Sequence, residues 1–215
     1  MYITYLLLVA TILISVKGFN DYSFRDRFML NPYLITHEKA WYRSFTHAFL
    51  HGDFMHLAFN MFALYIFAVS VTPDMGNYES YSLEPELIRR YGNKGYLYFG
   101  MLYLGGILCS TLWTIAKYKN NPGYNALGAS GAVSAVIFAY ILLNPMTEMG
   151  VFPFPPIIPA FIFGPLLLIS EYFLAKRGGT GIAHEAHIAG ALFGIAFMAV
   201  VDFDLIVNFF DNFRL

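Results

Sequence analysis

Six apolar runs separated by polar segments dominate the hydrophobic pattern of this chain. They cover about residues 1–16, 54–71, 95–116, 128–143, 157–175 and 186–201. A helix that crosses a bilayer needs about 20 mostly apolar residues, and these runs have that order of length. The pattern therefore predicts an all-α polytopic membrane protein. We expect one compact bundle of six transmembrane helices, a single membrane domain over residues 1–215.

The segments between the runs predict the connections. Residues 17–51 are rich in Phe, Tyr and Arg, the mixture favoured at the level of the lipid headgroups. We expect a long interfacial loop there, anchored by Trp41, Tyr42 and Arg43. Residues 72–94 are expected to form a charged loop, and residues 146–156 a short Pro-rich one.

Composition narrows the function classes. Hydrophobic residues make up 58% of the chain and charged residues only 13%, whereas about a quarter of a soluble domain is charged. The net charge of -1 provides no basic field, which excludes nucleic-acid binding. The single cysteine, Cys109, excludes an intramolecular disulfide, a Cys-rich metal site and an iron-sulfur cluster. Membrane lipids are the expected surroundings, and no cofactor is implied.

Four polar residues inside the apolar runs need an explanation: His56, Asn60, Ser130 and His187. They lie near the starts of the second, fourth and sixth runs. Because successive spans alternate in direction, these three starts lie on the same side of the membrane. A polar side chain in hydrocarbon is costly unless it is paired, and it commonly marks a functional site. The pattern predicts that the four residues share one depth.

Ser130 and His187 are candidates for nucleophile and general base. Gly190 and Gly194 lie three and seven positions after His187, on the same helix face, so a neighbouring helix can approach closely. Such an approach is what brings a hydroxyl and an imidazole within hydrogen-bond distance. Ser130 and His187 are therefore predicted to form a catalytic pair.

The tetrahedral oxyanion of such a reaction needs hydrogen-bond donors. His56 and Asn60 are spaced i and i+4, on one face of the second run. Together with the backbone N–H of Ser130 at a helix N-terminus, they are the predicted oxyanion donors.

No acidic residue is well placed by sequence to orient His187. Glu185, two residues away, points elsewhere on a helix, and Asp202 lies about 22 Å along the axis. Glu171 in the fifth run reaches His187 only if tertiary packing happens to bring it there. The sequence therefore favours a Ser-His dyad over a triad.

Three further histidines, His47, His51 and His184, are predicted to take no part in the chemistry. The run from His184 to His187 is one residue shorter than the His-Glu-x-x-His zinc pattern, so we predict no metal site. His47 and His51 fall outside the apolar runs and are expected to tie the first loop to the bundle.

At these residues the chain resembles the rhomboid family of intramembrane serine proteases. The resemblance covers essentially the whole chain. It rests on Trp41-Tyr42-Arg43 with Thr46-His47, on the stretch from His56 to Asn60 and Met61, on Gly128-Ala129-Ser130-Gly131, and on Ala186-His187-Ile188-Ala189-Gly190 with Gly194.

The resemblance implies a rhomboid-like six-helix bundle in which Ser130 attacks a peptide bond in or near the transmembrane segment of a protein substrate. His187 would act as base and later as acid, and His56, Asn60 and backbone N–H groups would form the oxyanion hole. A small residue such as alanine is expected before the scissile bond. One position departs from the family: Ser134 stands where some members carry an aromatic that packs on the catalytic ring.

Two further expectations concern location and an alternative function. With a cytoplasmic N-terminus, nine Lys and Arg residues lie in the outer connections and four in the inner ones, against the positive-inside rule. We nevertheless follow the resemblance, which implies a cytoplasmic N-terminus in a bacterial plasma (inner) membrane. The alternative function is a non-catalytic rhomboid-like membrane chaperone that binds client helices.

Overall fold

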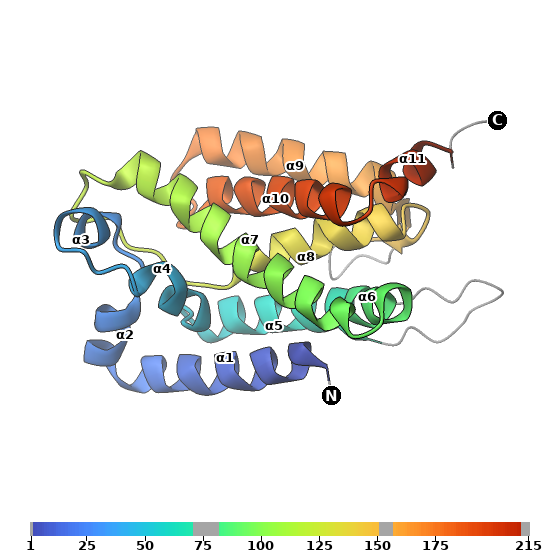
Figure 1. Cartoon of the computed structure of the whole chain (residues 1–215). Coiled ribbons are helices and arrows are strands. Elements are labelled where there is room, and N and C mark those ends of the chain that lie inside the picture. The colour runs from blue at the N-terminus through green and yellow to red at the C-terminus, as the bar shows by residue number, and fades with distance from the viewer. Residues whose placement is uncertain (1, 71–81, 151–156, 212–215) are drawn as a thin grey trace.

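Six long helices lie side by side in the computed structural model, which describes residues 2–70, 82–150 and 157–211 (Figure 1). They are α1 (Ile3–Asn20), α5 (Phe54–Ala68), α7 (Lys94–Tyr118), α8 (Ser130–Leu143), α9 (Ala160–Arg177) and α10 (His184–Val201). The helices α1, α7 and α10 are long and apolar enough to cross a membrane, and α5 and α8 are shorter apolar helices. Each of the six predicted runs overlaps one of these helices, and the helical membrane fold is confirmed.

The helix ends differ from the predicted limits for local reasons. The fourth helix begins at Ser130 rather than at residue 128, because Gly128 has a φ of +119°, outside the helical region. The fifth begins at Ala160, after a short strand. The first continues to Asn20, four residues beyond the predicted end.

The first connection is helical, and the prediction of a continuous loop is wrong. It contains α2 (Tyr22–Phe28), α3 (Pro32–His37), α4 (Arg43–Thr46) and the 3₁₀ turn η1 (His47–Phe49). Side chains cap two of these helices: Asp21 accepts the backbone N–H of Phe24, and Asn31 accepts that of Leu34, each at 2.9 Å. Such caps stabilise helices that are otherwise too short to persist.

Arg43 is buried, whereas its two aromatic neighbours in the sequence are exposed. Trp41 and Tyr42 are exposed, as expected of interfacial anchors. Arg43 is buried, and its Nη1 donates to the backbone oxygens of Asp26 and Met29, each at 2.8 Å. Its interpretation as a headgroup anchor is therefore wrong, because the short helices fold around it and use its charge to satisfy their carbonyls.

The other connections also contain regular structure. Residues 82–94 were expected to be loop but include α6 (Leu83–Tyr91), while residues 71–81 lie outside the described part. Strands β1 (Glu148–Met149) and β2 (Ile158–Pro159) pair antiparallel across the Pro-rich segment, a small exception to the all-α prediction. Residues 151–156 of that segment lie outside the described part. A last helix, α11 (Asp204–Asp211), follows α10.

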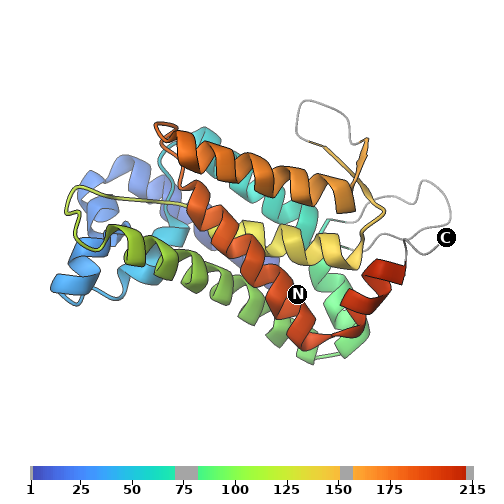
Figure 2. The ribbon, with the colours of Figure 1, turned by 90° about the horizontal axis from the view of Figure 1, so that it is seen from above.

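The centre of the bundle is α8, which contacts α5, α7, α9 and α10. Figure 2 shows α9 and α10 close together at the end where their loop joins them and diverging toward their other ends. The α8–α10 contact is a contact of backbones: a Cβ on Gly190 would overlap the carbonyl oxygen of Gly131, and a Cβ on Gly194 that of Ala135. Glycine is required at both positions, and the predicted close approach of α10 to a neighbour is confirmed.

Candidate functional site

A cavity of about 650 Å³ lies where α5, α8 and α10 begin. His56 from α5, Ser130 from α8 and Glu185 from α10 line it, together with residues of the loop that precedes α10. The three helix starts thus meet at one end of the bundle, which agrees with the shared side that the alternation of spans predicts.

Ser130 is the first residue of α8 and is partly exposed. The chain reaches it through Gly128, whose N–H donates to the carbonyl oxygen of His47 at 3.1 Å. A Cβ at Gly128 would lie 2.8 Å from Nε2 of His56, so both the positive φ and the approach of this ring require glycine. The result is a hydroxyl at a helix N-terminus, where unpaired backbone N–H groups favour negative charge.

His187 lies one helical turn before Gly190, and Gly190 packs on Gly131, the neighbour of Ser130. The two predicted catalytic residues therefore occupy facing turns of α8 and α10. Among the residues that the structure describes, no hydrogen bond joins Ser130 to His187. The Nδ1 atom of His187 instead lies 3.1 Å from Oε2 of Glu171, leaving Nε2 as its other ring nitrogen.

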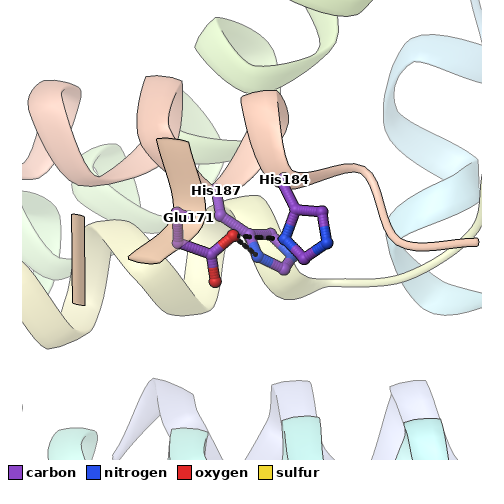
Figure 3. Close-up of side chains that lie close together, drawn as sticks. All are labelled: Glu171, His184 and His187. Carbon is purple, nitrogen blue, oxygen red and sulfur yellow. Dashed lines mark hydrogen bonds and ion pairs between the residues drawn. The ribbon is translucent and has the colours of Figure 1, made fainter. Parts of the chain in front are cut away.

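Glu171, on α9, is the residue that sequence reasoning set aside (Figure 3). Its Oε2 atom is 2.6 Å from Nδ1 of His184 as well as 3.1 Å from Nδ1 of His187. Tertiary packing does bring Glu171 to His187, against the expectation from the sequence, because α9 packs alongside α10 and turns the glutamate toward both rings. The available signal was the glutamate itself, a charge inside an otherwise apolar run.

The same three residues are a possible ligand set for a metal ion. One ligand atom from each of Glu171, His184 and His187 lies within 4.8 Å of the others, and two imidazoles with a carboxylate suit Zn²⁺. Tetrahedral ligands held about 2.0–2.1 Å from zinc lie about 3.3 Å apart. The 2.6 Å contact between Glu171 and His184 is shorter than that and has the geometry of a hydrogen bond.

The two predicted oxyanion donors lie in different surroundings. His56 borders the cavity, and its ring is near enough to His187 for the two to interact electrostatically. Asn60 is buried, and its Nδ2 donates to the backbone oxygen of His56 at 2.9 Å. Of this pair, only His56 is among the residues that line the cavity.

His47 and His51 have the predicted structural role. Nδ1 of His51 lies 2.9 Å from the hydroxyl of Ser15 on α1, and that hydroxyl donates to the backbone oxygen of Phe49. Burial lowers the pKa of His47 to about 4 and that of His51 to about 3, so both rings are neutral at pH 7. The edge of the His51 ring meets His56, with centroids 4.9 Å apart, so the first connection also supports a residue of the cavity.

The loop between α9 and α10 forms one wall of the cavity. Gly178, Gly179 and Gly181 have φ values of +64°, +75° and +72°, a conformation that other residues rarely adopt. Beside this loop, the ammonium of Lys117 pairs with the carboxylate of Glu185. The expectation that Glu185 points away from His187 is confirmed.

Comparisons with known proteins point to one family. The profile of the family described as Rhomboid domain matches residues 38–202. Two Arabidopsis thaliana proteins are similar. RHOMBOID-like protein 12, mitochondrial, is 27% identical over 176 residues, which is 78% of this chain and 50% of the relative. Rhomboid-like protein 11, chloroplastic, is 28% identical over 187 residues, 81% of this chain and 58% of the relative.

The chain thus spans about half to three-fifths of the length of these relatives, at 50% and 58%. Their names place them in mitochondria and chloroplasts. The comparisons consequently give no support to the expectation of a bacterial inner membrane.

Proposed function

Because the chain belongs to the rhomboid family, we propose that it is an intramembrane serine endopeptidase that cleaves transmembrane protein substrates. Ser130 is the nucleophile and His187 the general base. The main support is the backbone contact between Gly131 and Gly190, which holds these two residues on facing turns, with Ser130 lining the cavity. We expect the hydroxyl of Ser130 to turn toward Nε2 of His187 when a substrate binds.

In the first half of the reaction, Oγ of Ser130 bonds to the scissile carbonyl carbon and its proton passes to Nε2 of His187. The negative oxygen is stabilised by the backbone N–H of Ser130 and by the His56 ring. Asn60 is the further donor, through the second N–H of its side-chain amide. Each such donor is worth about 2.7–4 kcal/mol in comparable soluble sites. The C–N bond then breaks as His187 returns the proton to the leaving amine.

In the second half, a water molecule attacks the acyl ester of Ser130. His187 takes a proton from this water, and the ester C–O bond breaks as the proton returns to Oγ. One water is consumed for each peptide bond. The cavity of about 650 Å³ beside Ser130 is large enough to hold the water that this step needs.

The test uses the full chain in detergent with a synthetic transmembrane peptide that has alanine before the scissile bond. Ser130→Ala and His187→Ala should each abolish cleavage while the melting temperature stays near that of the unmodified protein. A fluorophosphonate should label the unmodified protein but not Ser130→Ala. Ser170→Ala is the matched control, because Ser170 is exposed and bonds within its own helix to the carbonyl of Leu167.

Undiminished cleavage by Ser130→Ala would reject the proposal. If the unmodified protein neither cleaves the peptide nor reacts with the fluorophosphonate, the client-binding chaperone becomes the better hypothesis.

A further inference from the structure

A single carboxylate oxygen on α9 meets two imidazoles of α10. The Nδ1 atoms of His184 and His187 lie 2.6 Å and 3.1 Å from Oε2 of Glu171 (Figure 3). The side chains are largely withdrawn from solvent, with 16% of Glu171, 18% of His187 and 5% of His184 exposed. Charge-assisted hydrogen bonds in such surroundings are about twice as strong as neutral ones.

The hydrogen bonds around this cluster define where its protons lie. Thr180 Oγ1 accepts the backbone N–H of Ile182 at 3.2 Å, and its own proton is therefore available for Nε2 of His184 at 2.8 Å. His184 then carries its proton on Nδ1 and donates it to Glu171. His187 likewise donates from Nδ1 to the same oxygen. This pattern, assigned from the network, leaves the lone pair of His187 on Nε2, the form that a general base requires.

We propose that Glu171 is the positioning residue of His187, so that the site works as a Ser130–His187–Glu171 triad with His184 holding the carboxylate in place. The inference rests on the proposed protease function. Glu171 selects the tautomer of His187, aims its ring, and stabilises the imidazolium that forms when Ser130 loses its proton.

Two substitutions separate the charge of Glu171 from its positioning role. Glu171→Gln retains one oxygen that can accept both imidazole N–H groups, because both bonds use the same atom, but it loses the negative charge. Glu171→Ala loses both. With the full chain in detergent and the transmembrane peptide, we expect kcat to fall about 10-fold in Glu171→Gln and about 10²-fold in Glu171→Ala.

The expected changes lie in chemistry rather than in binding or folding. KM should stay within about twofold of the unmodified protein, because Glu171 is not among the residues that line the cavity. The rate of fluorophosphonate labelling of Ser130 should fall in parallel with kcat. The melting temperature of each variant and the matched control Ser170→Ala, which changes the neighbouring residue on α9, show whether the fold is intact.

Each outcome decides one point. If the unmodified protein is active and Glu171→Ala keeps its full kcat, or loses activity only through KM or through unfolding, Glu171 does not position His187, while the protease function stands. If the unmodified protein neither cleaves nor labels, the protease function itself fails. If EDTA abolishes the activity of the unmodified protein, the cluster is a metal site, and the triad is overturned.

Discussion

Glu84 and Glu171 are both carboxylates withdrawn into an apolar helical bundle, but they bind different donors. Glu84 on α6 is completely buried and accepts the backbone N–H groups of Ile3 and Thr4, at 2.6 Å and 3.0 Å, and the hydroxyl of Thr4 at 2.6 Å. Glu171 is partly exposed and accepts two imidazoles. Backbone N–H groups do not titrate, whereas imidazoles gain and lose protons near neutral pH.

The difference in donors predicts a difference in role. The bonds of Glu84 satisfy the first turn of α1 and attach that helix to α6, which is a contribution to stability. The bonds of Glu171 join groups that can change protonation, and the proposed role of this residue is therefore in chemistry. The role of a carboxylate inside a membrane bundle is therefore best inferred from the donors it binds. Substitutions at Glu84 and at Glu171 can each test this comparison.

The largest expected effect on stability comes from Glu84→Ala. It removes three hydrogen bonds to a charged group and leaves the N-terminus of α1 unsatisfied, for a loss of about 3–5 kcal/mol in the free energy of unfolding. Unfolding by SDS titration measures it. The kcat of the folded fraction should be unchanged. If the variant stays stable but loses kcat, Glu84 acts in the chemistry as proposed for Glu171, and the difference in role between the two glutamates is refuted.

The second prediction concerns the pH dependence of stability, which arises from buried histidines that are neutral in the folded protein. Burial lowers the pKa of His47 to about 4 from an ordinary value of 6.5, so between these pH values the unfolded chain binds more protons than the folded one. Stability should therefore be complete above pH 6.5 and fall as the pH drops toward 4, by about 3 kcal/mol for this residue.

His47→Asn isolates that contribution. The asparagine amide can replace the N–H that Nδ1 of His47 directs at the backbone oxygen of Arg43, but it does not titrate. Unfolding curves at several pH values between 7 and 4 should be flatter for the variant than for the unmodified protein. An unchanged slope would mean that His47 is not the source of acid sensitivity.

The smallest effect is expected for a third carboxylate, Glu185. Its partner Lys117 has 46% of its side chain exposed, and ion pairs of this kind contribute about 0–1 kcal/mol. Lys117→Ala should lower the free energy of unfolding by less than about 1 kcal/mol, and the difference should shrink in high salt. A larger loss that persists in high salt would show that the contribution of these three glutamates to stability does not follow their exposure to solvent.

Much of the fold follows from local properties of the chain. The lengths of the apolar runs predicted six helices, and the alternation of their directions predicted that α5, α8 and α10 begin on the same side of the membrane. The spacing of Gly190 and Gly194 predicted the close approach of α10 to a neighbour, which is α8. These features depend on hydrophobicity, helix period and the absence of a side chain, all of which can be counted along a sequence.

The hydrogen-bond partners of the polar side chains could not be predicted from these local properties. Arg43 looked like an interfacial anchor and is buried, and Asn60 uses one N–H of its amide for the backbone of its own helix.

By itself, then, the sequence determined a helical membrane bundle of the rhomboid type and named Ser130 and His187 as the pair to examine. Only the tertiary structure decided that Glu171 meets His187 and that Glu84 closes the end of α1. The physical reason is the distance along the chain over which each property is set. Burial and helix period are properties of neighbouring residues, whereas a hydrogen bond extends about 3 Å and depends on how separate helices are packed and rotated.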